Sequence, residues 1–149
     1  MTSAAVYGTG SWGTAYASVL ADAGTNVTMW GRRQEVVDQI NAGTNEDYLP
    51  ELRLPSTIRA TSDPFEAAAG ADIVVLAVPS QTLRANLEAW GSALPSSAAI
   101  VSLMKGVELG TTRRMSEVIS EVGGVEPERV VIVSGPNLAR EIAVKQPAA

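Results

Sequence analysis

At 149 residues, 46% of them hydrophobic, the chain has the composition of one globular domain and can bury about two-thirds of its unfolded surface. Its formal net charge of -5 disfavours nucleic acid as a partner, because no broad basic face is available to neutralise phosphates. The sequence has no cysteine and no histidine, which excludes a thiolate nucleophile, an imidazole acid or base, and a Cys/His metal site. No apolar stretch approaches the roughly 20 residues that span a bilayer, so we expect a cytoplasmic protein with no membrane partner and no bound metal.

Apolar, β-branched runs alternate along the chain with segments of helical composition. In chain order, the expected strands span residues 4–7, 27–30, 57–60, 72–78, 99–103 and 130–133. The expected helices span residues 12–23, 34–41, 64–69, 81–90 and 111–122, and a last one opens near Leu138. Most of the strand runs are continuous rather than alternating, which is typical of strands buried on both faces of a parallel sheet. The sequence therefore predicts an α/β, Rossmann-type fold: a doubly wound, mostly parallel sheet with helices on both faces.

The hexapeptide GTGSWG, residues 8–13, lies where the first strand ends and the first helix begins. In that setting Gly8 permits a tight turn, Gly10 lets the backbone approach a pyrophosphate, and Gly13 allows the helix to lie close to the strand. The N–H groups of the first helical turn would then face the phosphates. The alternative is a glycine-rich turn without a ligand. Because a strand, the motif, a helix and a second strand follow within one βαβ unit, the motif predicts a dinucleotide site.

The second strand ends without the acid that an NAD-specific site usually has about 20 residues after the glycines to hold the ribose 2′-hydroxyl. The chain has Gly31, Arg32 and Arg33 there instead. Two guanidinium groups favour a 2′-phosphate through charge-assisted hydrogen bonds, or they could stack on the adenine. The alternative is that both arginines are ordinary surface residues at a helix entry. The expected cofactor is NADPH, with NADH possible.

Other element ends also have recognisable chemistry. Asp63, followed by a proline, is predicted to cap the helix at 64–69, and Gly24, Gly70 and Gly123 fit helix ends. Residues 43–56 contain two prolines and several polar residues, so we expect them to form a surface excursion between the second helix and the third strand.

Three later strand ends carry residues that could serve a site. Pro79 would stiffen the turn after the fourth strand, where residues 78–81 either contact the cofactor or only form a turn. Lys105 follows the fifth strand, so it would point into the ligand crevice and pair with a phosphate or polarise a carbonyl oxygen, unless it is an ordinary exposed lysine. Asn137 either caps the last helix or reaches into the crevice.

Four motifs taken together resemble the NAD(P)-dependent glycerol-3-phosphate dehydrogenases of the bacterial type. They are GTGSWG at 8–13, VPSQ at 78–81, KGVE at 105–108 and SGPNLARE at 134–141. The resemblance covers the whole chain, and the last two motifs are its most specific part. It implies reversible hydride transfer between NAD(P)H and dihydroxyacetone phosphate, which gives sn-glycerol 3-phosphate, a precursor of phospholipids.

The resemblance also implies roles for individual residues. Cofactor contacts would come from Ser11, Trp12, Arg32, Arg33, Lys105 and Ala139, in addition to the glycines of the turn and Pro79. The phosphate-bearing substrate would be faced by Lys105, Gly135 and Asn137. Bacterial relatives often have serine or threonine where this chain has Asn137, so the departure keeps a hydrogen-bonding side chain.

The larger departure from the family is length. Its members continue into a mostly helical C-terminal domain that supplies the lysine acting as general acid or base, and neither Lys105 nor Lys145 matches that lysine's motif. Residues 142–149 end without a capping glycine or polar tail, as though another element were to follow. We therefore expect residues 1–149 to be a dinucleotide-binding domain with negligible turnover alone. Its partners would be that missing C-terminal domain and, in the full-length enzyme, a possible second copy in a homodimer.

Two other functions stay open at this point. One is the first half of another two-domain NADP-dependent reductase, of the 6-phosphogluconate, 3-hydroxyacyl-CoA or ketopantoate type, although the KGVE and SGPNLARE motifs argue against it. The other is a non-catalytic NADPH-binding module that senses redox state or binds a partner.

Overall fold

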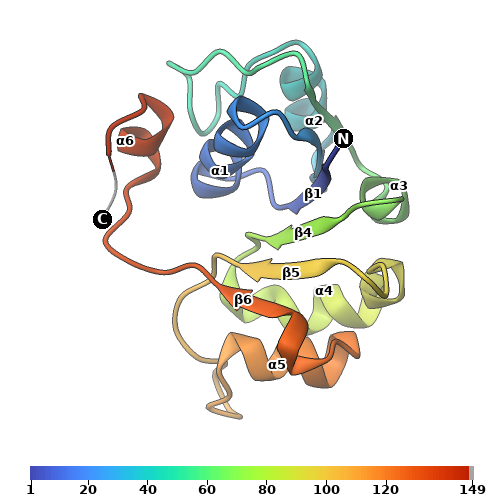
Figure 1. Ribbon diagram of the computed structural model, residues 1–149. Coiled ribbons are helices and arrows are strands. Elements are labelled where there is room, and N and C mark those ends of the chain that lie inside the picture. Colours follow the sequence, from blue (N-terminus) through green and yellow to red (C-terminus); the bar gives the residue numbers. More distant parts are fainter. Residues whose placement is uncertain (148–149) are drawn as a thin grey trace.

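Six parallel strands form one sheet at the centre of the computed structural model, which describes residues 1–147 (Figure 1). The strands are β1 (Ser3–Tyr7), β2 (Asn26–Trp30), β3 (Ile58–Thr61), β4 (Ile73–Leu76), β5 (Ala99–Ser102) and β6 (Val130–Ile132). Their order in the sheet is β3-β2-β1-β4-β5-β6, so the chain winds outward in both directions from β1 and β4. The predicted doubly wound Rossmann topology is confirmed. The expectation drawn from residues 142–149 concerns in part residues 148 and 149, which lie outside the described residues.

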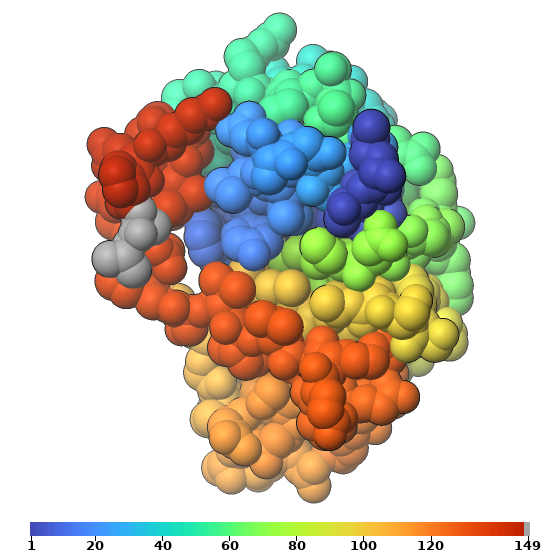
Figure 2. Space-filling model, in the orientation of Figure 1, coloured from blue at the N-terminus to red at the C-terminus, as the bar shows by residue number. Residues whose placement is uncertain are grey.

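Helices cover both faces of this sheet. They are α1 (Ser11–Asp22), α2 (Gln34–Asn41), α3 (Pro64–Ala68), α4 (Leu83–Trp90), α5 (Met115–Gly123) and α6 (Ala139–Ala143). The first two pack on one face, and α3, α4 and α5 pack on the other (Figure 1). The short α6 lies against α1 on the side away from the sheet, and the space-filling view shows its segment beside α1 on the surface (Figure 2).

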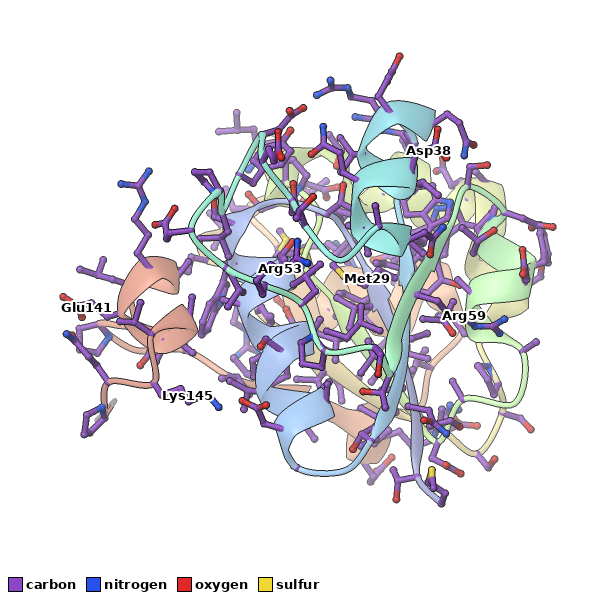
Figure 3. All side chains as sticks on the ribbon, turned by 90° about the horizontal axis from the view of Figure 1, so that it is seen from above. Met29, Asp38, Arg53, Arg59, Glu141 and Lys145 are labelled. Carbon is purple, nitrogen blue, oxygen red and sulfur yellow. The ribbon has the colours of Figure 1, made fainter. Side chains whose placement is uncertain are left out.

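Alternate residues of the central strands enter the two cores. Val6, Met29 and Val75 face α1 and α2, and Met29 lies in the interior of that layer (Figure 3). The side chain of Tyr7 points to the opposite face, where its ring stacks on Trp90 with the ring centroids 4.2 Å apart. Both faces of the strands are therefore buried, which explains why their sequences are continuously apolar.

Most of the predicted element ends are close to the observed ones. The carboxylate of Asp63 accepts a hydrogen bond from the N–H of Phe65 at 2.8 Å and so caps α3, and Gly24 and Gly70 follow the ends of α1 and α3. The glycine that ends α5 was predicted one residue too early, because Gly123 is still helical.

The predicted start of the helix at residue 111 is wrong, since α5 begins only at Met115. The side chain of Glu117 accepts a hydrogen bond from the backbone N–H of Arg114 at 2.8 Å, which fixes the first helical turn there. Residues 107–114 form a closed loop instead, with a bridge between Val107 and Arg114. The side chain of Glu108 accepts a hydrogen bond from Arg84 of α4, and this contact fixes the loop in a non-helical conformation.

Residues 43–56 connect α2 to β3 as a largely exposed segment, as expected, but the segment is also anchored in the interior. Asn45 and Leu49 are fully buried, and Leu49 packs with Ala15 of α1 and Ala143 of α6. Two exposed ion pairs join the same parts of the chain. Arg140 of α6 lies 3.7 Å from Glu51 of this segment, and Lys145, just after α6, lies 3.2 Å from Asp22 at the end of α1. Figure 3 shows the side chain of Lys145 reaching toward α1. The segment is thus anchored by Leu49 where α1 and α6 meet.

Candidate functional site

The glycine turn brings the backbone of β1 and α1 into close contact. A Cβ atom on Gly8, whose φ is +120°, would lie 2.5 Å from the carbonyl oxygen of Ala77. A Cβ atom on Gly13 would lie 2.4 Å from the carbonyl oxygen of Gly8. A Cβ atom on Gly10 would meet nothing within 4 Å. The first and third glycines are therefore required for packing, whereas the second leaves open space for a ligand.

That open space belongs to a cavity of about 520 Å³ at the carboxyl ends of the strands. Its volume is in the range of small-molecule and cofactor sites. It is lined by Gly8 to Gly13, Trp30 to Arg33, Tyr48, Ala77 to Ser80, Thr82, Asn86 and Leu103 to Lys105. Gly10 precedes α1 and offers no capping side chain, so the first N–H groups of the helix are not satisfied by a cap. The predicted glycines, Ser11, Trp12, Pro79 and both arginines therefore meet at one cavity.

The turn after β2 approaches the glycine turn closely. A Cβ atom on Gly31 would lie 2.6 Å from the Cγ2 atom of Thr9, so only glycine fits this contact. The next two residues, Arg32 and Arg33, are exposed and line the cavity. Nη2 of Arg33 lies 3.1 Å from a carboxylate oxygen of Asp47, an acid that the sequence pattern did not indicate.

The segment 43–56 contributes Tyr48 to the lining of this cavity and is fixed to the glycine turn. The side-chain amide of Asn45 donates hydrogen bonds to the carbonyl oxygen of Thr9 and to the hydroxyl of Thr14, both at 2.9 Å. The hydroxyl of Ser11 donates to the carbonyl oxygen of Tyr48 at 3.1 Å, and Tyr48 itself lines the cavity. Sequence reasoning missed Asn45 and Tyr48, because a polar loop gives no signal that one of its asparagines is buried.

A second cavity of about 230 Å³ adjoins the first. It is lined by Trp12, Lys105, Val133, Ser134, Gly135, Asn137 and Ala139. Trp12 and Lys105 line both cavities, and Nζ of Lys105 donates a hydrogen bond to the carbonyl oxygen of Gly135 at 2.9 Å. The three residues expected to face a substrate therefore lie together in a separate, adjoining cavity, and so does Ala139.

Asn137 does not cap α6, so the capping interpretation of this residue is wrong. The residue at the N-cap is Leu138, and no side chain there bonds the helix N–H groups. Asn137 instead lies one residue earlier and lines the second cavity. Of the two alternatives for this side chain, the one that directs it to the crevice agrees with the structure.

The loop that follows Lys105 is held by two side chains from the α4 region. The side-chain amide of Gln81 donates to the carbonyl oxygen of Val107 and accepts from the N–H of Leu109, both at 2.9 Å. Arg84 makes two hydrogen bonds to Glu108, at 2.8 and 3.0 Å. These bonds and one from a threonine hydroxyl lower the pKa of Glu108 to about 2. The acid of the KGVE motif thus anchors the loop, and Gln81 clamps it rather than lining the cavity.

Residues 1–147 contain neither a cluster of metal ligands nor a membrane-spanning helix. No group of three or more His, Cys, Asp or Glu side chains in this part of the chain could hold a metal ion. Among the same residues, no helix is both long enough and apolar enough to cross a membrane.

Comparisons with known proteins agree with this geometry. The sequence matches the family described as NAD-dependent glycerol-3-phosphate dehydrogenase N-terminus over residues 3–149. A protein from Streptomyces avermitilis named glycerol-3-phosphate dehydrogenase (NAD(P)+) is 60% identical over 147 residues, which are 98% of this chain and 44% of that protein. A protein from Mycobacterium tuberculosis with the same name and the number 2 is 60% identical over 97% of this chain and 44% of its own length.

The fold is similar to that of a solved relative. A crystal structure of glycerol-3-phosphate dehydrogenase from Coxiella burnetii superposes with a TM-score of 0.88 and 33% sequence identity, over 99% of this chain and 45% of that one. The chain therefore spans less than half the length of these relatives. With its six parallel strands, its glycine turn and a family match that extends over nearly all of its residues, the chain belongs to the NAD-dependent glycerol-3-phosphate dehydrogenase N-terminus family.

Proposed function

We propose that this chain is the cofactor-binding half of an oxidoreductase that transfers hydride between NAD(P)H and dihydroxyacetone phosphate. The observation that carries the proposal is the meeting of two cavities at Trp12 and Lys105. Hydride transfer needs the cofactor and the substrate side by side in a fixed orientation, which adjoining cavities provide. The nicotinamide supplies the hydride when bound, and the protein supplies binding and orientation. Family membership supports this reaction over another two-domain reductase or a sensor module.

The larger cavity suits a dinucleotide with a 2′-phosphate. The space beside Gly10 and the N–H groups at the start of α1 fit a pyrophosphate, because the helix N-terminus favours negative charge. Arg32 and Arg33 offer guanidinium groups at the carboxyl end of β2, where an NAD-specific site has an acid. These groups would hold the pyrophosphate and the adenosine ribose of the same cofactor, and NADPH is the form that has a 2′-phosphate for the arginines.

The smaller cavity suits a small phosphorylated ketone. Lys105 presents an ammonium group, fixed by the carbonyl oxygen of Gly135, that could pair with a phosphate or stabilise negative charge on a carbonyl oxygen during reduction. The amide of Asn137 adds a hydrogen-bond donor to the same cavity. In this proposal the proton-transferring lysine comes from a part of the enzyme outside this chain, so these residues would bind and orient the substrate.

Titration calorimetry with NADPH and NADH tests the cofactor part of the proposal. We expect NADPH to bind more tightly, and the double variant Arg32→Gln/Arg33→Gln to lose about tenfold or more in NADPH affinity, as removal of charge-assisted hydrogen bonds implies. The double variant Arg53→Gln/Arg59→Gln is the control, since it loses the same charge and neither arginine lines the cavity.

Two results would contradict this proposal. One is equal affinity of the unmodified chain for NADPH and NADH. The other is steady oxidation of NADPH with dihydroxyacetone phosphate by residues 1–149 alone, because the general acid is proposed to lie elsewhere. A homodimer of a longer protein and a cytoplasmic location stay predictions.

A further inference from the structure

An acid reaches the proposed 2′-phosphate position from an unexpected part of the chain. The residues after β2 contain no carboxylate until Glu35, whose Oε2 lies 3.8 Å from Nε of Arg33. Asp47, in the segment 43–56, comes closer, at 3.1 Å from Nη2 of Arg33. The side chain of Asp47 is 34% exposed against 76% for Glu35, so Asp47 is the better shielded of the two acids. Arg33 therefore already has an anionic partner in this structure.

Asp47 is held in this place by contacts that do not involve Arg33. Its Oδ1 accepts a hydrogen bond from the side-chain amide of Gln39 at 3.2 Å, and the carbonyl of the same amide accepts from the N–H of Glu46 at 2.9 Å. On either side of Asp47, Asn45 bonds the glycine turn and Leu49 is fully buried. The carboxylate is thus held beside Arg33, which lines the cofactor cavity.

We propose that Asp47 sets the preference between NADPH and NADH by competing with the 2′-phosphate for Arg33. The proposal rests on the cofactor site described above. A 2′-phosphate that approaches Arg33 must share the guanidinium group with Asp47 and meets the like charge of this carboxylate, whereas the ribose hydroxyl of NADH meets no such repulsion. Asp47 therefore lowers the affinity for NADPH and leaves that for NADH nearly unchanged. It acts through Arg33 as a positioning residue.

The variant Asp47→Asn tests this directly in the 149-residue chain. Asparagine keeps an oxygen that can accept the hydrogen bond from Gln39 but removes the charge. Since exposed ion pairs are weak, we expect NADPH to bind about two- to fivefold more tightly, with NADH affinity and the thermal unfolding midpoint unchanged. The gain should shrink as ionic strength rises. The control Glu35→Gln removes the same charge from the more exposed and more distant acid, and we expect a smaller gain.

Each outcome of these titrations supports or overturns the proposal. A ratio of NADPH to NADH affinity that rises more in Asp47→Asn than in Glu35→Gln supports it. An unchanged or lower ratio, a gain shared equally by both cofactors, or an equal gain in Glu35→Gln overturns it while the proposed cofactor site stands. If the unmodified chain binds neither cofactor, the site and this inference fail together.

Discussion

The glycine turn allows one prediction to be worked out in detail. Alanine at Gly13 should lower the stability of the fold, whereas alanine at Gly10 should weaken cofactor binding. In Gly13→Ala the new Cβ would lie 2.4 Å from the carbonyl oxygen of Gly8 and 3.2 Å from the Cβ of Ala77. Both contacts involve atoms fixed by the sheet, so α1 would have to move away from β1. In Gly10→Ala the new Cβ meets no atom of the protein within 4 Å and projects into space that we assign to the pyrophosphate.

The two costs differ in size and in kind. A clash with a backbone oxygen should cost about 2–3 kcal/mol, the upper part of the usual range for overpacking, and alanine returns about 1 kcal/mol of helix propensity, so Gly13→Ala should lower the free energy of unfolding by about 1–2 kcal/mol. For a domain of this size, that corresponds to a fall of about 2–8 °C in the unfolding midpoint. In Gly10→Ala the loss at the N-cap and the gain in backbone entropy offset each other to within about 0.5 kcal/mol.

Two measurements separate these effects. Thermal unfolding followed by circular dichroism should show a lower midpoint for Gly13→Ala and little change for Gly10→Ala. Titration of NADPH followed by its fluorescence should show a loss of about tenfold or more for Gly10→Ala, which corresponds to about 1.4 kcal/mol. The steric argument is refuted if Gly13→Ala is as stable as the unmodified chain. The placement of the pyrophosphate is refuted if Gly10→Ala binds NADPH normally.

Two further predictions concern the loop after β5. Lys105→Ala should weaken the binding of dihydroxyacetone phosphate to the NADPH-loaded chain by about tenfold or more, as loss of a charge-assisted hydrogen bond implies, whereas Lys145→Ala should not; calorimetry compares the two. Since Arg84 holds the pKa of Glu108 at about 2, below its ordinary value of 4.5, the ionised carboxylate stabilises the fold above pH 4.5, and this contribution is lost as the pH falls toward 2. The difference in unfolding midpoint between the unmodified chain and Glu108→Gln should therefore shrink across that window in a series of melting curves, and a constant difference would contradict the assignment.

Sequence reasoning predicted the sheet well because its signals are local. Each buried parallel strand is a short apolar run, and the glycine turn marks the passage from the first strand into the first helix. It failed at residues 107–114, where helical composition suggested an early start for α5. The contact between Arg84 and Glu108 joins residues far apart in the sequence and overrides local propensity, and no pattern in the loop itself announces it.

The residues of the candidate site also fall into a group that local sequence signals predict and a group that they do not. Lys105 and the arginines could be predicted because each follows a strand, and the carboxyl ends of parallel strands meet at one edge of the sheet, whereas Gly135 was expected only from the family resemblance. Asn45 and Asp47 could not, since their segment has no helical or strand periodicity. Their positions depend on how residues 43–56 fold back onto α1, which is a tertiary contact.

The outer side of α1 explains why the two cavities adjoin. Trp12, in the first turn of this helix, lines both cavities, and Leu49 and Ala143 are buried together against Ala15 one turn later. Leu49 belongs to the segment that walls the first cavity, and Ala143 belongs to α6, whose first residue lines the second. Because both segments pack on the same helix, α1 holds the glycine turn and also fixes the distance between these two segments. The helix that receives the pyrophosphate in our proposal would therefore also align the substrate cavity with the cofactor.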